Sequence, residues 1–228
     1  PLEGKREYEP GERLNFNLVL VGKTIDYLPY FIYAFDQMGK TGIGRKSDGG
    51  RAAFALKEVA AGREIVYSSL NGKMRQGSFT SDLTLPDPSC EQGKAVSEAT
   101  LTLRTPLRLK YDNHLNAVLP FHVLVRAMLR RASSLLQYHG GGEPALDYRG
   151  LAARAEAIRV AESSLRWFDW KRFSNRQDQS MLLGGMVGSV AYIGDITEYI
   201  SLIRFCEKVH LGKQTSFGLG KIELTRIA

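Results

Sequence analysis

The hydrophobic pattern of the chain changes period several times and predicts alternating strands and helices. Apolar residues alternate with polar ones over 14–21 and 222–227, which favours strands, and four apolar residues spaced for one helical face predict a helix over 197–210. Between that helix and the last strand lies the stretch 210–221, which contains three glycines. Because glycine readily adopts positive φ, this glycine-rich loop is expected to turn its backbone amides outward and to suit a polyanion.

The first 96 residues predict part of one domain. The strand at 14–21 is followed by a helix over 24–38, whose aromatic residues favour packing in the core or between domains over stacking on bases. A glycine turn at 39–46 and a strand at 52–59 come next. Because strand, helix, glycine turn and strand occur in the same order at the end of the chain, we expect a degenerate internal repeat. A chance resemblance between two glycine turns is the alternative.

The pattern restarts after a run rich in Gly, Ser, Asp and Pro, which predicts a domain boundary at residue 97. A long strand begins at Glu98, and Pro106 within it indicates a sheet edge or a bulge. Further expected elements are a helix at 120–138, a short helix at 147–155, and strands near 158, 167–176 and 186–193. This β-α-β-β-α-β order is that of a ferredoxin-like domain. We therefore predict an α+β protein of tandem ferredoxin-like domains with antiparallel sheets, of which 1–96 is incomplete and 97–228 complete.

Charge is unevenly distributed and favours an anionic partner. Residues 1–96 contain 13 basic and 12 acidic side chains, whereas 97–228 contain 18 and 12, so that the second half carries +6 of the net +7. Such a surplus is typical of nucleic-acid binding, with a solvated basic surface as the alternative. Cys90 and Cys206 are too few for a zinc cluster and indicate reduced thiols. Without an apolar run long enough for a membrane helix, we expect a soluble, cytoplasmic protein.

Two further segments combine basic residues with a surface that a nucleic acid could contact. The helix at 120–138 has a basic face opposite its apolar one, and the stretch 167–176 alternates basic residues with two tryptophans. Aromatic residues interleaved with cations can stack bases and neutralise phosphates. A solvated helix face with local ion pairs, and core packing of the tryptophans, are the alternatives. The basic residues concerned are Arg126, Arg130, Arg131, Lys171, Arg172 and Arg176.

Five stretches together carry a resemblance to a known family: 121–140, 147–150, 167–177, 184–188 and 210–221. They resemble the CRISPR-associated endoribonucleases of the RAMP superfamily, which cut precursor CRISPR RNA in its repeats. The resemblance implies tandem ferredoxin-like domains, with the glycine-rich loop between the last helix and the last strand, and precursor CRISPR RNA as the partner. The family has a strand, a helix and a strand ahead of the position of Leu14. Their absence here leads us to expect the later part of a longer protein.

The chemistry that the resemblance implies needs neither metal nor cofactor. A ribose 2′-hydroxyl attacks the adjacent phosphate and leaves a 2′,3′-cyclic phosphate and a 5′-hydroxyl, assisted by a general base, an acid and cations. In the family the general-base histidine usually lies on the first helix, which this sequence lacks. Here His139 and His210 adjoin glycine-rich backbone and are the catalytic candidates, with helix capping as the alternative. His114 is expected to be exposed, and His122 to be structural.

We expect RNA to contact the loop and the two basic segments. The RNA-binding candidates are Gly212, Lys213, Gln214, Thr215, Ser216, Gly218, Gly220, Lys221, Arg130, Arg131, Lys171, Arg172 and Arg176. Replacing Gly218 or Gly220 by valine should weaken binding while the domain stays folded, because a β-branched residue does not adopt positive φ easily.

Two functions from different classes remain open. In the first, the intact protein is a metal-independent ribonuclease. In the second, it is a non-catalytic RAMP subunit that binds guide RNA within a CRISPR effector complex. A histidine on the first helix of the longer protein would favour the enzyme. A mononucleotide-binding enzyme is disfavoured, because no pair of carboxylates is placed for magnesium.

RNA binding is expected to depend strongly on salt, because the half that carries +6 must act through phosphates. Each phosphate contact with a single strand contributes about −0.7 to the slope of log affinity against log salt concentration. Titrations of a repeat-containing RNA at several salt concentrations measure this slope. A slope near zero would contradict binding through phosphates.

Overall fold

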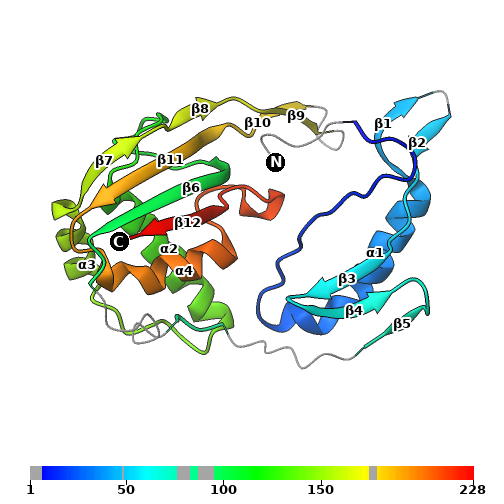
Figure 1. Ribbon diagram of the computed structural model, residues 1–228, viewed down its shortest axis with the longest axis horizontal. Coiled ribbons are helices and arrows are strands. Elements are labelled where there is room, and N and C mark those ends of the chain that lie inside the picture. The colour runs from blue at the N-terminus through cyan, green and yellow to red at the C-terminus, as the bar shows by residue number, and fades with distance from the viewer. Residues whose placement is uncertain (1–6, 48, 76–82, 87–94, 175–178) are drawn as a thin grey trace. The chain divides into compact units, whose positions relative to one another are not determined.

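The computed structural model describes residues 7–47, 49–75, 83–86, 95–174 and 179–228 (Figure 1). The chain separates into two compact units. Leu20–Leu83 forms the N-terminal unit, and Thr84–Ala228 together with Pro1–Val19 forms the C-terminal unit. The domain boundary expected at residue 97 stays a prediction. Within the described residues, no helix combines the length and the apolar character that crossing a membrane requires.

The N-terminal unit contains a long helix and small antiparallel sheets. Its elements are η1 (Gly22–Tyr27), α1 (Leu28–Thr41), β1 (Ile43–Ser47) paired with β2 (Gly50–Ala52), and a sheet of β3 (Glu58–Ala61), β4 (Glu64–Ser68) and β5 (Lys73–Met74). Pro29 lies at the start of α1, where its missing N–H leaves no helical hydrogen bond unmade. Together η1 and α1 cover the helix predicted at 24–38, which is confirmed.

The strand predicted at 14–21 is wrong for the described structure. These residues form no strand there, and the apolar side chains of Leu14, Phe16 and Leu18 are exposed. Alternating apolar residues specify which face a strand would bury, but a strand also needs a neighbour to complete its backbone hydrogen bonds. The sequence pattern alone carries no information about that neighbour.

The glycine turn predicted at 39–46 and the single strand predicted at 52–59 are also wrong. α1 continues through Gly39, and Gly42, with φ of +83°, then turns the chain into β1. Gly39 lies within the helix, and a side chain is excluded there because another chain segment packs against it: a Cβ atom would lie 2.3 Å from the carbonyl oxygen of Phe54. Two separate strands, β2 and β3, stand where one was expected. The predicted internal repeat is therefore wrong at three of its four elements.

The C-terminal unit has the β-α-β-β-α-β order of a ferredoxin-like fold. Its elements are β6 (Glu98–Leu107), α2 (Phe121–His139), α3 (Tyr148–Arg154), η3 (Ala155–Ala157), β7 (Arg159–Ser163), β8 (Arg166–Phe168), β9 (Lys171–Ser174), β10 (Gln179–Leu182), β11 (Gly185–Ile193), η4 (Thr197–Tyr199), α4 (Ile200–Val209), η5 (Thr215–Phe217) and β12 (Ile222–Ile227). The main sheet runs β12-β6-β11-β7 with antiparallel neighbours, and β8 also pairs with β11. The α+β class with antiparallel sheets is confirmed.

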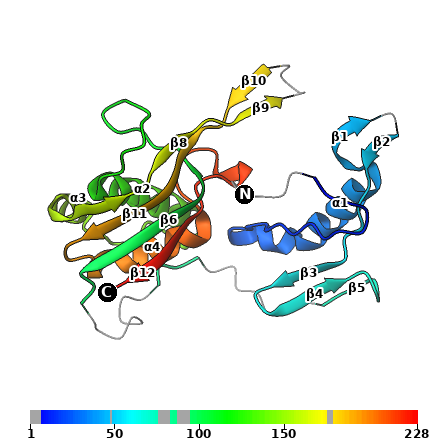
Figure 2. The same ribbon diagram turned by 45° about the horizontal axis from the view of Figure 1, so that its top comes forward.

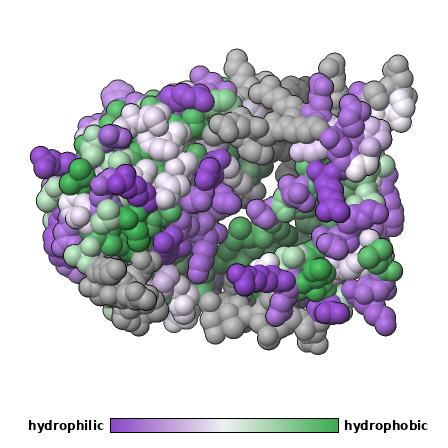
Figure 3. Space-filling view, viewed as in Figure 1, coloured by the Kyte–Doolittle hydropathy of each residue, from purple (hydrophilic) through white to green (hydrophobic). Residues whose placement is uncertain are grey.

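The core of the C-terminal unit lies between this sheet and the helices α2 and α4 (Figure 2). Ala99, Leu101 and Leu103 alternate as buried residues along β6. Phe121, at the start of α2, packs edge-on against Tyr192 and Tyr199, with ring centroids 4.9 and 5.1 Å apart. Such aromatic pairs contribute roughly 0.5–1.5 kcal/mol beyond the area they bury. The surface in view in Figure 3 is a mosaic of polar and apolar residues.

Pro106 marks a bulge rather than a sheet edge. β6 is central, between β12 and β11, so the edge alternative is wrong. Leu103 and Leu107 pair with Gly188 and Met186 of β11, so four steps along β6 match only two along β11. The extra residues around Pro106 have no regular partners in the sheet, which is expected for a residue without an N–H.

The described part of the aromatic and basic stretch predicted at 167–176 forms strands, as expected. β8 pairs with β11, and the chain continues into the β9–β10 hairpin, in which Lys171 pairs with Leu182. The expected RNA-binding residues Lys171 and Arg172 lie on β9, whereas Arg176 lies outside the described residues. Cys206 is buried and free, and Cys90 also lies outside the described residues.

Candidate nucleic-acid interface

The glycine-rich loop begins where α4 ends, and Arg131 of α2 holds this point in place. The Arg131 guanidinium donates from Nη2 to the carbonyl oxygen of Val209 at 2.7 Å and from Nε to that of His210 at 3.2 Å. Its half-buried position lowers the pKa of Arg131, although an arginine remains charged. These carbonyls belong to the last turn of α4, which has no partners for them of its own. Arg131 therefore caps α4. The sequence alone suggests only phosphate binding or a solvated helix face with ion pairs for this residue.

The end of the loop is fixed by the bulge in β6. Gly220 donates its N–H to the carbonyl oxygen of Pro106 at 3.0 Å, and Lys221 donates to Oγ1 of Thr105 at 2.8 Å. The carbonyl oxygen of Lys221 in turn accepts the N–H of Arg104 at 2.8 Å. The regular pairing of β12 with β6 stops at Ile222, opposite Leu103. The backbone groups beyond that pair are thus available to hold the loop.

The three loop glycines have positive φ but different surroundings. Gly212, Gly218 and Gly220 have φ of +82°, +79° and +75°. A Cβ at Gly220 would lie 1.7 Å from the Leu211 carbonyl oxygen, and one at Gly212 would lie 2.8 Å from that of Arg108. A Cβ at Gly218 would meet nothing within 4 Å. Gly212 and Gly220 thus permit the loop to close, whereas Gly218 faces open space. The prediction that valine weakens binding while the domain stays folded is therefore wrong for Gly220 and remains a prediction for Gly218.

Between these glycines the backbone presents donors without internal acceptors. Gln214 has the left-handed φ of +65°, and the helical turn η5 follows it directly. This succession makes neighbouring N–H groups converge, as in anion-binding nests. Among the described residues, no acceptor is present for the amides of Gln214, Thr215 and Ser216. The buried Oε1 of Gln214 likewise has no hydrogen-bond partner in the described structure.

His210 closes the loop from its beginning to its end. Its Nδ1 lies 3.2 Å from the carbonyl oxygen of Leu219, and because a carbonyl only accepts, we assign the proton to Nδ1. Burial lowers the pKa of His210, as do the positive charges of Lys221 and Arg131, while the bond to Leu219 opposes them. The imidazole is therefore neutral at pH 7, with Nε2 as an acceptor.

The other candidates are placed apart from this site or lack defined contacts. His139 is the exposed last residue of α2, eight residues or about 12 Å of helix beyond Arg131. Arg130 is also exposed, and no described acidic side chain pairs with it. Arg126 pairs with Glu156 at 3.0 Å, as the ion-pair alternative predicted.

The remaining two histidines lie where the sequence predicted. His114 is exposed, and the ring of His122, in the first turn of α2, packs against Tyr111 with centroids 6.1 Å apart.

Two residues near the loop were missed by the sequence reasoning. Phe217 lies in the loop and is 46% exposed, although a large aromatic side chain normally avoids water. Arg108 directly follows β6, and its carbonyl oxygen accepts the N–H of Lys213 at 3.3 Å. An aromatic residue among glycines and lysines was a visible signal for Phe217, whereas nothing in the local pattern distinguishes Arg108.

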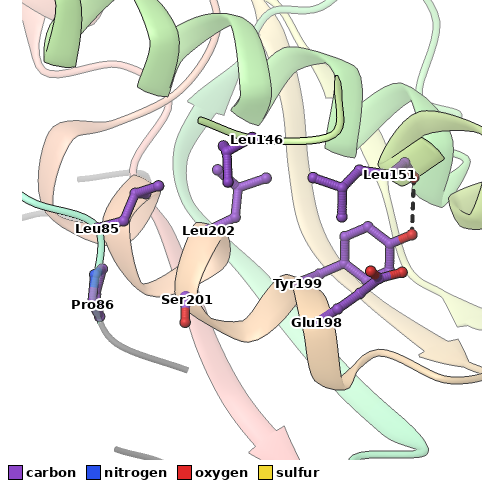
Figure 4. Close-up of a pocket in the computed structure, with 8 residues that line it drawn as sticks. All are labelled: Leu85, Pro86, Leu146, Leu151, Glu198, Tyr199, Ser201 and Leu202. Atoms are coloured by element: carbon purple, nitrogen blue, oxygen red, sulfur yellow. Dashed lines mark hydrogen bonds between the residues drawn. The ribbon is translucent and has the colours of Figure 1, made fainter. Parts of the chain in front are cut away.

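A separate cavity lies at the other end of α4. It has a volume of about 220 Å³ and is mostly apolar (Figure 4). Its lining residues are Leu85, Pro86, Leu146, Leu151, Glu198, Tyr199, Ser201 and Leu202. Tyr199 donates its hydroxyl to the Leu151 carbonyl oxygen at 2.9 Å, and Glu198 pairs with Arg154 at 2.8 Å. Because its lining is mostly apolar and both Tyr199 and Glu198 already have partners, this cavity is not a candidate for chemistry. Nor do the described residues gather His, Cys, Asp or Glu side chains into a group that could hold a metal ion.

The fold and the loop together define a ferredoxin-like protein with a glycine-rich loop between its last helix and last strand. A family model for the CRISPR-associated endoribonuclease Cas6 matches residues 101–222, which is more than half of the chain. The chain therefore belongs to the Cas6 family. A second family model, described as an N-terminal domain, matches residues 1–79. None of the curated proteins compared with the chain matches it.

Several solved Cas6 structures are similar to this chain. A Cas6 product complex has 18% identity and a TM-score of 0.41, and the match covers 61% of this chain and 57% of that one. A Cas6 substrate-mimic complex has 20% identity and a TM-score of 0.39, with coverages of 60% and 56%. Cas6 from Thermus thermophilus has 14% identity and a TM-score of 0.42, with coverages of 57% and 54%. The chain thus spans little more than half the length of these proteins.

Alanine at Gly220 is expected to destabilise the C-terminal unit more than alanine at Gly218. Positive φ costs a non-glycine residue roughly 1–2 kcal/mol, and Gly218→Ala should show only this cost. Gly220→Ala adds a clash with the backbone of Leu211, which has to move. Gly141→Ala is the matched control, because Gly141 lies in the same unit, has φ of +89° and also faces open space. Thermal denaturation of the three variants measures the difference, and equal losses at positions 218 and 220 would contradict it.

The stability of the C-terminal unit should decrease toward acid pH in part through His210. Because the pKa of His210 is lowered in the folded state, the unfolded state takes up the proton first as pH falls. Stability is complete above the unfolded pKa of about 6.5 and decreases as pH falls toward the folded value. His210→Asn keeps a donor for the Leu219 carbonyl and tolerates positive φ, so it should flatten this decrease. Melting curves between about pH 8 and pH 5 test this; parallel curves for both proteins would refute the assignment.

Proposed function

We propose that this chain is part of a metal-independent endoribonuclease that cleaves precursor CRISPR RNA within its repeats. Membership of the Cas6 family supports this function, and similar Cas6 proteins are known in product and substrate-mimic complexes. The observation that carries the proposal is the run of amides without a described acceptor at 214–216, flanked by Lys213 and Lys221. Backbone donors with flanking cations recognise phosphate without reading the base.

The loop offers RNA three kinds of contact. The amides of Gln214, Thr215 and Ser216 bind one phosphate, and the lysines on either side attract its neighbours. Phe217 is exposed beside these amides and stacks on an unpaired base, since every base presents a π-face. A single strand bound here would therefore have its phosphate held by backbone and a base held by Phe217.

The β9–β10 hairpin supplies a second basic element to the same strand of RNA. Trp170, directly before β9, is 40% exposed, whereas Trp167 is half-buried and donates its indole N–H to Asp169 at 2.9 Å. Trp170 is thus the better stacking candidate of the two. Lys171 and Arg172 follow it on β9 and add positive charge.

Cleavage by a 2′-hydroxyl needs a base, and His210 is the better placed of the two histidine candidates. The nucleophile is part of the RNA, so no metal-activated water is required. His210 is neutral at pH 7 and offers Nε2 as proton acceptor, with its ring held by Leu219. The amides of 214–216, for which no acceptor is described, lie in the same loop and stabilise negative charge on the phosphate in the transition state. His139, exposed and unsupported by a described hydrogen bond, is the second candidate.

Incubating the protein with repeat-containing RNA and a metal chelator is expected to give a single cut that ends in a 2′,3′-cyclic phosphate. His210→Asn should slow cleavage by about 100- to 10,000-fold, the usual contribution of a general base, without weakening RNA binding. His139→Asn is the matched control and should cleave at the normal rate. Product ends are identified by mass spectrometry, and binding by titration of uncleavable 2′-deoxy RNA.

The outcomes separate the two functions. Cleavage that requires added metal would overturn the proposed chemistry. A normal cleavage rate in His210→Asn would show that the general base is another residue. Tight and specific binding without any cleavage would favour the alternative, a non-catalytic subunit that binds guide RNA in a CRISPR effector complex.

A further inference from the structure

Arg108 touches two elements that are far apart in the sequence. Its backbone carbonyl accepts the N–H of Lys213 in the glycine-rich loop at 3.3 Å. Its side chain points to the β9–β10 hairpin, where Nη1 lies 3.2 Å from the carbonyl oxygen of Gly184 and 3.4 Å from that of Leu182. One residue therefore joins the loop to the returning strand of the hairpin.

Glycines bring both elements close to the end of β6. A Cβ at Gly185 would lie 2.8 Å from the carbonyl oxygen of Leu107, and one at Gly212 would lie 3.0 Å from Cδ1 of the same leucine. Any larger residue at either position would push its element away from β6. The backbone around Leu107 and Arg108 is thus packed against the hairpin base through Gly185 and against the loop through Gly212.

The hairpin needs such an anchor. Among the strands that the structure describes, β9 and β10 pair only with each other, outside the main sheet. An isolated two-stranded hairpin is marginally stable in water. Hydrogen bonds from a charged donor are stronger than those between neutral groups. Because Arg108 binds main-chain carbonyls at Leu182 and Gly184, it fixes the backbone where the hairpin leaves the sheet.

We propose that Arg108 is a positioning residue that holds the β9–β10 hairpin at a fixed place relative to the glycine-rich loop, so that one RNA strand meets both. This inference rests on the proposed function, because it assigns a purpose to the shared anchor. Arg108 acts through the elements that it holds, so its loss should weaken RNA binding without removing a phosphate contact.

The test compares Arg108→Met with Arg108→Lys and with Arg226→Met in the intact chain. Arg226→Met is the matched control, since Arg226 is an exposed arginine of β12 whose partner is Glu98. Hydrogen exchange is first followed without RNA. In Arg108→Met, amides of 179–184 should exchange about tenfold faster, as expected for losing bonds to a charged donor, while those of 211–221 stay unchanged.

Binding of a single-stranded repeat RNA is then measured over a range of salt. Arg108→Met should bind about tenfold more weakly with an unchanged salt slope. Arg108→Lys should fall between Arg108→Met and the unmodified protein, because Nη1 alone makes both contacts and an ammonium keeps donors for them on a shorter side chain. Arg226→Met should match the unmodified protein in both measurements.

Three results would overturn the inference. Unchanged exchange in the hairpin would show that Arg108 does not anchor it. Faster exchange throughout the unit would show a general structural role. A salt slope smaller by about 0.7 with unchanged exchange would make Arg108 a direct phosphate contact instead. Failure of the unmodified protein to bind repeat RNA would count against the proposed function alone, because the exchange measurement decides the anchor without RNA.

Discussion

The bulge at Pro106 is the constraint on which the candidate site depends. The backbone groups of a central strand normally form hydrogen bonds with both neighbouring strands. At Pro106, however, the proline has no N–H, and the pairing of β6 with β11 shifts register. On the β12 side of β6, where regular pairing stops at Ile222, the carbonyl oxygen of Pro106 accepts the N–H of Gly220, and Oγ1 of Thr105 accepts that of Lys221.

This support divides the loop into a rigid frame and an open tip. Gly212 and Gly220 have no space for a side chain, and Arg131 and His210 tie the loop to α2 and to itself. N–H groups at both ends of the frame already have acceptors within the protein, whereas those of the tip, 214–216, have no described acceptor. A site built this way requires little reordering when an anion arrives, which reduces the entropy cost of binding.

How far the sequence predicts this structure depends on whether the information is local. The helix at 120–138, the strand at 222–227 and the loop between α4 and β12 are specified by period and by glycine, and the structure has them. The strand at 14–21 needed a partner, and the capping by Arg131 needed the packing of α2 against α4. The role of Arg108 could not be predicted for the same reason, because its side chain binds carbonyl oxygens more than 70 residues away in the sequence. Long-range backbone contacts leave no local pattern.

The electrostatics of His210 connect the frame to the proposed chemistry. In the free protein, burial and the cations Lys221 and Arg131 all disfavour a proton on this imidazole. A phosphate bound at the tip would bring negative charge toward the same group, and nearby negative charge raises the pKa of a histidine. The imidazole would then accept a proton more readily with RNA bound than without it. In the proposed mechanism, the loop that binds the phosphate would thereby also raise the basicity of His210, a coupling that a histidine on an exposed helix end, such as His139, would not have.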